Sequence, residues 1–156
     1  MQILYILLLV IIDHITKYIA KIQLSYGKSV TLIDGFLELI YVENRGAAFG
    51  ILKNKKFFLV GITTIAIIGM IYYLVRTTNL NKWERMSLIF IISGAIGNLI
   101  DRIFRGYVVD FIHFYIKDIF DWPVFNIADI LVVIGAIILA FSILFLKNDG
   151  VMLWLK

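Results

Sequence analysis

Two aspartates in the second half of the sequence are the residues whose types and surroundings best suit acid–base chemistry. Asp110 lies among apolar residues with no Lys or Arg within four positions, and Asp129 follows Asn126 by three positions. Two carboxyl groups held together in a weakly polar environment do not both ionise easily, so one keeps a proton while the other is anionic. Such a couple can deprotonate a water molecule and protonate a tetrahedral intermediate, and its titration belongs to both groups. This would be peptide hydrolysis without a metal or a covalent intermediate, although spacing alone does not bring the two residues together.

A second set of polar residues occurs at helical spacing within apolar segments. Asp13 and Lys17 are four positions apart, acid before base, which is the favoured order for an ion pair on one helix face. Asn98, Asp101 and Arg102 share a face at spacings of three and four. The simpler interpretation is structural: a pair that neutralises two buried charges, and a network that fixes the end of a helix bundle. Because an ionisable group in a membrane costs about 2.5–3.5 kcal/mol on insertion scales, a functional interpretation stays open.

Small residues accompany these polar groups. Gly94 and Gly97 precede Asn98 and remove side-chain bulk, so a neighbouring helix can approach closely. The segment Asn44-Arg45-Gly46-Ala47-Ala48-Phe49-Gly50 places small residues beside an amide and a guanidinium, just before an apolar stretch. This pattern suits close approach of the backbone to a ligand or to another helix.

The elements that must position these residues follow from the composition. Of 156 residues, 62% are apolar and 17% are charged, and the mean hydropathy is +0.95. Soluble domains are about 45–50% apolar and about 25% charged, so the sequence predicts an integral membrane protein. Long apolar runs favour helices over a β-barrel, whose strands alternate in polarity. The predicted fold class is therefore an all-α membrane protein.

Four stretches are long enough to cross a bilayer, which takes about 20 mainly apolar residues. They cover about 1–22, 57–75, 86–104 and 125–146, and we expect one integral membrane domain over 1–156. Alternating traverses bring the end of the first and third spans to the same membrane face as the start of the second and fourth. Loops of about 23–56 and 105–123 open on that face, so nearly every polar residue converges there. The first span lacks a basic n-region and an A-x-A cleavage site, and we expect it to be permanent.

The first loop is predicted to contain a small β-hairpin or sheet between spans one and two. Val30 to Ile33 and Phe36 to Val42 have strand-like composition, and Asp34-Gly35 between them is typical of a two-residue hairpin turn. Its apolar and aromatic side chains should lie at the membrane interface.

Competing chemistries have less support. The absence of Cys from the sequence removes disulfides, thiolate metal sites and cysteine nucleophiles. The three serines in the predicted spans have no Lys or His at helical spacing, and His14, His113 and Asp110 form a poor zinc set without an H-E-x-x-H motif. We expect neither metal nor cofactor. The net charge of +4 and pI near 9.3 suit anionic lipid headgroups, and no nucleic-acid motif occurs.

Two alternatives from other functional classes stay open. A small proton-coupled transporter or channel could also place carboxylates at a bundle end. Against it, the polar residues gather at one end instead of forming a path, and apart from Thr63 and Thr64 the second span offers little polarity. A non-enzymatic membrane scaffold is the third possibility.

Five short motifs occur in order along nearly the whole chain: Asp13-His14-Ile15-Thr16-Lys17, Asn44-Arg45-Gly46-Ala47-Ala48-Phe49-Gly50, Gly94-Ala95-Ile96-Gly97-Asn98-Leu99-Ile100-Asp101-Arg102, Gly106-Tyr107-Val108-Val109-Asp110-Phe111 and Phe125-Asn126-Ile127-Ala128-Asp129. In this order the motifs resemble those of the bacterial prolipoprotein signal peptidases, also called signal peptidase II. Ser93 stands where many relatives have Gly, and we expect this small replacement to be tolerated.

The resemblance implies an aspartyl endopeptidase that removes the signal peptide of a diacylglyceryl-modified prolipoprotein just before the lipidated Cys. The family's catalytic pair falls on Asp110 and Asp129. Its supporting positions, which would bind substrate or hold the acids, fall on Asp13, Lys17, Asn44, Gly46, Asn98, Asp101, Arg102 and Asn126. The implied partners are the prolipoprotein, membrane lipids and globomycin-type inhibitors, with the chain acting as a monomer in the bacterial cytoplasmic membrane.

Orientation is the point at which charge counting and the resemblance disagree. Ten cations lie on the side of the polar loops, namely Lys17, Lys21, Lys28, Arg45, Lys53, Lys55, Lys56, Arg102, Arg105 and Lys117. Five lie on the other side, namely Arg76, Lys82, Arg85, Lys147 and Lys156. The positive-inside rule alone would place the polar end in the cytoplasm. The resemblance implies cytoplasmic termini, an extracytoplasmic hairpin and an active site at the outer face, and we follow it.

Overall fold

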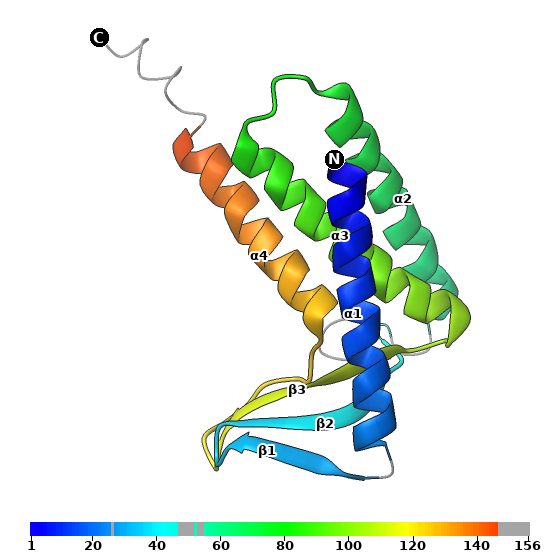
Figure 1. Cartoon of the computed structure of the whole chain (residues 1–156), viewed down its shortest axis with the longest axis vertical. Coiled ribbons are helices and arrows are strands. Elements are labelled where there is room, and N and C mark those ends of the chain that lie inside the picture. The colour runs from blue at the N-terminus through cyan, green and yellow to red at the C-terminus, as the bar shows by residue number, and fades with distance from the viewer. Residues whose placement is uncertain (26, 47–51, 53–54, 147–156) are drawn as a thin grey trace.

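A computed structural model describes residues 1–25, 27–46, 52 and 55–146 of the chain, and four long helices dominate it (Figure 1). They are α1 (Gln2–Leu24), α2 (Lys56–Arg76), α3 (Lys82–Phe104) and α4 (Ile127–Phe141), the last of which continues as a π-helical turn over Ser142–Leu146. Each is long and apolar enough to cross a membrane. The prediction of four apolar helices is therefore confirmed.

Helix α3 begins at Lys82, earlier than the predicted start of the span at 86, because Asn81 caps it. The Asn81 side chain accepts hydrogen bonds from the backbone N–H groups of Trp83 and Glu84, and the Glu84 carboxylate accepts one from the Asn81 N–H. This reciprocal cap satisfies backbone groups that the helix leaves unpaired. Hydropathy alone gave the later start, since the first turn of α3 is polar.

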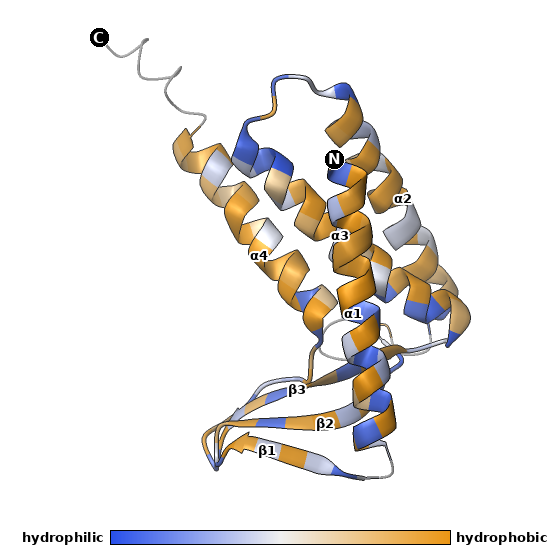
Figure 2. Ribbon diagram, viewed as in Figure 1, coloured by the Kyte–Doolittle hydropathy of each residue, from blue (hydrophilic) through white to orange (hydrophobic). Residues whose placement is uncertain are grey.

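Helix α3 lies in the middle of the bundle and packs against α1, α2 and α4 (Figure 1). Gly97 lies where α1, α3 and α4 meet: a Cβ atom added there would be 2.5 Å from Asp13 Oδ2 on α1 and 3.4 Å from the Ala128 side chain on α4. Gly94 is equally tight against the Ala128 carbonyl. Close helix approach at these two glycines is confirmed. The outward faces carry exposed apolar side chains. Figure 2 shows that hydrophobic residues occur along the length of the four helices.

A four-stranded antiparallel sheet lies across one end of the helices, so the all-α description is incomplete. Its strands, in the order β1-β2-β3-β4, are β1 (Ser29–Ile33), β2 (Leu37–Asn44), β3 (Val108–Ile116) and β4 (Phe120–Asp121). The first two form the predicted hairpin, whereas β3 and β4 come from the second polar loop, for which no strand was predicted. Strand β3 is rich in β-branched and aromatic residues and is bounded by Gly106 and Asp118, both at positive φ. These features are typical of a strand between turns.

The hairpin turn between β1 and β2 has three residues instead of the predicted two. Ile33 pairs with Leu37, so Phe36 belongs to the turn, and its N–H donates to the Ile33 carbonyl at 3.1 Å. A two-residue type I′ turn would need positive φ at both central residues. Only Gly35 has one, at 72°.

His113 connects three strands of the sheet. Its Nδ1 lies 2.8 Å from Glu38 on β2, and its Nε2 lies 2.7 Å from Asp121 on β4. Burial acts to lower the pKa of His113, but the hydrogen bonds with the two carboxylates outweigh it and raise that pKa. The charged imidazole, which donates from both nitrogens, is therefore favoured, and it fastens the outer part of the sheet.

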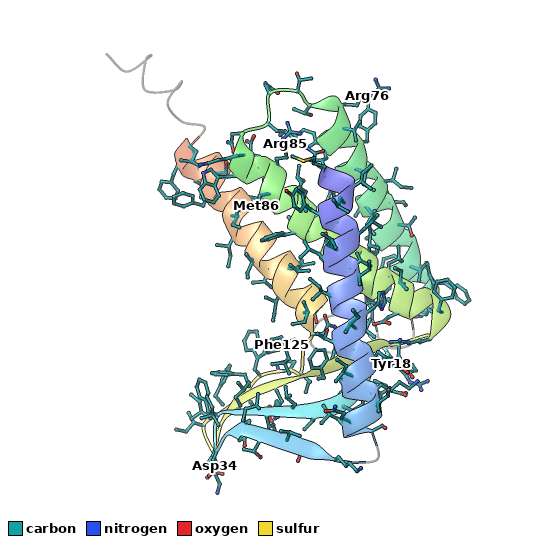
Figure 3. All side chains as sticks on the ribbon, viewed as in Figure 1. Tyr18, Asp34, Arg76, Arg85, Met86 and Phe125 are labelled. Atoms are coloured by element: carbon teal, nitrogen blue, oxygen red, sulfur yellow. The ribbon has the colours of Figure 1, made fainter. Side chains whose placement is uncertain are left out.

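The backbone of the sheet is joined directly to the start of α4. The N–H groups of Phe111 and Ile112 donate to the Phe125 carbonyl at 3.0 and 2.9 Å, and the Phe125 N–H donates to the Ile112 carbonyl at 3.0 Å. Figure 3 shows Phe125 at the base of α4, next to the sheet. Because Asp110 precedes Phe111 and Asn126 follows Phe125, this junction fixes one predicted acid beside the cap of the helix that carries the other.

Candidate active site

Asp110 is held by two amide side chains inside the junction of sheet and helices. It lies on β3 opposite Val42 and is 2% exposed. Its Oδ2 accepts from Asn44 Nδ2 at 2.9 Å, and its Oδ1 accepts from Asn126 Nδ2 at 2.6 Å. Asn44 is two residues along in the β2–β3 register, on the diagonal that brings side chains of one sheet face into reach.

Asp129 is positioned by the local sequence at the start of α4. Asn126 is the N-cap of this helix: its side-chain oxygen accepts from the Asp129 N–H at 3.0 Å, and Asp129 Oδ2 accepts from the Asn126 N–H at 3.2 Å. This capping box fixes the Asp129 rotamer. The second oxygen, Oδ1, accepts from Asn98 Nδ2 on α3 at 2.8 Å.

Asn126 connects the two acids. Its side chain donates to Asp110 and its backbone N–H donates to Asp129, while its Nδ2 also lies 3.2 Å from Asn98 Oδ1. Both carboxylates thus accept hydrogen bonds from one residue. Burial raises the pKa of Asp110 to about 6, and the charge of Asp129 adds to this rise, whereas the hydrogen bonds from Asn44 and Asn126 oppose it. A carboxyl group that titrates close to neutrality is suited to exchanging protons.

A buried ion cluster lies behind the amides. Lys17 Nζ is 2.8 Å from Asp13 Oδ2, 3.0 Å from Asp101 Oδ2 and 3.0 Å from Asn98 Oδ1, and its side chain is fully buried. The last contact fixes the orientation of the Asn98 amide, because the oxygen faces the ammonium and the NH₂ group is left to donate to Asp129. Asp13 Oδ1 accepts from the Ala128 N–H at 2.9 Å, which ties α1 to the first turn of α4.

Arg102 anchors the segment after β2. Its Nη2 donates to the Gly46 carbonyl at 3.0 Å, and its Nη1 lies 3.4 Å from the Asn98 carbonyl. The Gly46 N–H in turn donates to Asn44 Oδ1 at 2.9 Å, which turns the Asn44 NH₂ group toward Asp110. The remainder of the predicted small-residue motif, 47–50, lies outside the described residues.

All ten predicted site residues lie at the same end of the helices and are connected by these contacts; they are Asp13, Lys17, Asn44, Gly46, Asn98, Asp101, Arg102, Asp110, Asn126 and Asp129. Sequence reasoning missed Arg105, which pairs with Asp101 at 2.9 Å, although its i,i+4 spacing could have indicated this. It also missed the backbone N–H groups of Val109 and Ala128, which donate to Asp101 and Asp13 and leave no trace in side-chain patterns.

The two histidines do not join the acids in a metal-like cluster. His14 lies on α1 with Nδ1 4.0 Å from Asp101, and His113 pairs with carboxylates of the sheet. Within the described ranges, no three His, Asp or Glu side chains are arranged to hold a metal ion.

Comparison with known proteins bears on what this arrangement does. Residues 5–145 match the family model described as signal peptidase (SPase) II. The chain is 50% identical to a lipoprotein signal peptidase of Clostridium tetani, over 96% of this chain and 95% of the relative. It is 47% identical to a lipoprotein signal peptidase of Clostridium novyi, over 96% and 99% of the two chains.

Two solved structures of bacterial membrane enzymes have a similar fold. A structure described as a bacterial membrane enzyme at 2.3 Å resolution superposes with a TM-score of 0.82 at 37% identity, covering 94% of this chain and 88% of that one. A second, at 1.9 Å resolution, gives a TM-score of 0.80 at 36% identity over 92% of each chain. The chain belongs to the signal peptidase II family and is a multi-pass bacterial membrane peptidase of the aspartic type.

Proposed function

We propose that this protein cleaves the signal peptide from diacylglyceryl-modified prolipoproteins just before the lipidated Cys, with Asp110 and Asp129 as the catalytic pair. Membership of the family supports the substrate class. The single observation that carries the assignment of the pair is their shared donor: Asn126 donates to Asp110 from its side chain and to Asp129 from its backbone. Two buried acids tied to one residue are a suitable couple for activating a water molecule.

In the proposed reaction, the ionised member of the pair takes a proton from a water molecule, and the resulting hydroxide attacks the scissile carbonyl carbon. The protonated member gives its proton to the carbonyl oxygen. The tetrahedral intermediate then collapses: the C–N bond breaks, the amine nitrogen takes the proton that the first acid removed from the water, and the second acid recovers a proton from one hydroxyl group of the intermediate as the carbonyl re-forms. Asn44, Asn98 and Asn126 are neutral donors, so they orient the acids and favour the ionised form less strongly than a cation in direct contact would. The reaction needs no covalent intermediate.

We infer that the site and the sheet lie at the outer face of the cytoplasmic membrane, with both termini in the cytoplasm. The cation count that opposes this orientation includes side chains that are engaged within the fold. Ten Lys and Arg residues are counted on the side of the polar loops. Several of the ten are engaged inside the protein, including Lys17, Arg102 and Arg105.

The position of the site suits a lipid-anchored substrate. Two acyl chains attached to the substrate Cys would keep that residue in the bilayer beside the apolar outer surface of the helices. The scissile bond next to it would then reach the depth at which α4 begins and the sheet crosses the bundle. We expect a monomer to be sufficient, since both acids and all three amides come from one chain.

The test is cleavage of a diacylated precursor by purified protein. Asp110→Asn and Asp129→Asn should each lower turnover by at least a hundredfold while the protein stays folded, because each removes a proton-transfer group. Asp34→Asn, at the exposed hairpin tip, is the matched control and should cleave normally. An unmodified precursor should be a poor substrate, and globomycin should inhibit. Near-normal turnover by either Asn variant at the proposed pair would show that the pair is misassigned.

A further inference from the structure

A second polar cluster lies on the opposite side of β2 from Asp110. It is centred on Glu43, whose Oε2 lies 2.9 Å from Arg45 Nη2 and whose Oε1 lies 3.4 Å from the Tyr41 hydroxyl. The Glu43 carboxylate also interacts with the Tyr107 hydroxyl. The Arg45 guanidinium lies over the Tyr107 ring at 5.6 Å from its centroid, and the two tyrosine hydroxyls are 3.4 Å apart. The cluster thus joins the end of β2 to the turn that precedes β3.

At neutral pH, Glu43 in this cluster is ionised and Tyr41 is neutral. Burial acts to raise the pKa of Glu43, but the hydrogen bonds from Arg45 and Tyr107 outweigh it, so that the pKa lies below its usual range. Burial and the neighbouring Tyr107 raise the pKa of Tyr41 above its usual range, which keeps its hydroxyl protonated. Glu43 is therefore an ionised acceptor surrounded by donors.

The residue between the two ends of this cluster is Asn44. Side chains alternate along a strand, so Asn44 points away from Glu43 and Arg45 and toward Asp110. Glu43 pairs with Val109 in the β2–β3 register, directly beside Asp110. The backbone position of Asn44 is thus set from the outer side by its two neighbours, and its amide is oriented from the inner side by Gly46.

We propose that Glu43 is a positioning residue of the active site: by holding Arg45 and Tyr107 it fixes the end of β2, so that the Asn44 amide donates to Asp110. The hydrogen bond from Asn44 favours the ionised form of Asp110. Glu43 therefore acts on the proton affinity of Asp110 without touching it. The link to catalysis rests on the proposed function, whereas the link to the titration of Asp110 does not.

The experiment measures the titration of Asp110 directly, as the infrared carboxyl signal that is lost in Asp110→Asn, in full-length protein in detergent micelles. Asn44→Ala should move this titration up by about one pH unit, since a hydrogen bond to a charged group is lost. Glu43→Ala should move it up by about 0.3–0.5 of a unit, in keeping with the modest strength of exposed ion pairs, and Glu43→Gln should move it less. In the Asn44→Ala background, Glu43→Ala should add nothing.

Glu38→Ala is the matched control, because Glu38 is on the same strand but pairs with His113 at the far end of the sheet. It should leave the Asp110 titration unchanged. Equal shifts from Glu43→Ala with and without Asn44, or no shift at all, would overturn the proposal. The low-pH limb of cleavage should move with the titration in each variant. A limb that stays fixed while the titration moves would instead contradict the role of Asp110 in the proposed function.

Discussion

At the scale of single residues, the side chains that donate hydrogen bonds to the two acids of the candidate site are neutral. Asp110 and Asp129 receive hydrogen bonds from neutral amides, whereas the ammonium of Lys17 is one residue removed, behind Asn98. A cation in direct contact would hold its acid in the ionised form. Amides constrain geometry and leave the proton exchangeable. This arrangement makes the ionised form of Asp110 costly, because the carboxyl group is nearly inaccessible to water. Its only described side-chain hydrogen bonds are with amides.

That cost predicts a pH-dependent gain in stability for Asp110→Asn. Burial raises the pKa of Asp110 from 3.8 to about 6, so the folded protein holds this proton more tightly than the unfolded chain does. Stability from this group is fully present below pH 3.8 and is lost as the pH rises through about 6. A shift of this size corresponds to about 3 kcal/mol. The free energy of unfolding of Asp110→Asn, measured relative to the original protein in detergent micelles, should therefore increase from pH 4 to pH 8.

Asn at position 110 has one acceptor oxygen for two amide donors, so the variant also loses a hydrogen bond with Asn44 or Asn126. That loss does not depend on pH, which is why the slope is the informative quantity. Asp34→Asn, at an exposed position, should give a difference with no such slope. A flat difference for Asp110→Asn would show that the carboxyl group titrates normally.

The residue types of the site were predictable from the sequence, but the connections between them were not. Asp13 and Lys17 form the expected ion pair at i,i+4 spacing. The simple structural interpretation missed that the same lysine also reaches Asp101 and Asn98 on another helix, because contacts between segments leave no local pattern. The shared donor Asn126 was assigned only a supporting role through the resemblance.

At the scale of elements, small residues set the distance between α3 and α4, and that distance lets Asn98 reach Asp129. Helices in lipid gain little from apolar burial, so they associate through close packing. Gly94 and Gly97 on α3 are met by Ala128 on α4. Farther from the site, Gly135 on α4 faces Ser87 and Ile91 on α3. Strand β3 was missed because a long apolar run with one acid resembles a membrane-associated connection as much as a strand buried on both faces.

Gly135→Ala should destabilise the bundle, whereas Gly69→Ala should not. A Cβ atom at Gly135 would lie 2.7 Å from Ile91 Cγ1 and 2.8 Å from the Ser87 carbonyl oxygen, and backbone cannot move aside cheaply. Overpacking of this kind costs about 1–3 kcal/mol. Gly69, on the exposed side of α2, has no atom within 4 Å of the added Cβ, and Ala is the better helix former. Unfolding by denaturing detergent measures both, and equal stability of the two variants would contradict the tight α3–α4 contact.

At the scale of the whole molecule, polarity is distributed unequally between the two ends. The acids and amides of the site, the sheet and most charged residues lie at one end, and the short α2–α3 connection lies at the other (Figures 1 and 2). The positions of the polar residues along the predicted spans were sufficient to predict this asymmetry, because successive spans cross the membrane in opposite directions. They were not sufficient to predict orientation, because the cation count includes side chains that are engaged within the fold.

Cysteine labelling tests the orientation cleanly, since the natural sequence has no Cys to give background. Asp34 and Thr78 are exposed at opposite ends of the structure, in the hairpin turn and in the α2–α3 connection, and Figure 3 shows Asp34 far from Arg76 and Arg85. In intact cells stripped of their walls, a membrane-impermeant thiol reagent should modify Asp34→Cys and leave Thr78→Cys unmodified. After lysis both variants should react, which controls for intrinsic accessibility. The reverse pattern would place the sheet and the proposed catalytic pair in the cytoplasm, as the positive-inside rule alone would.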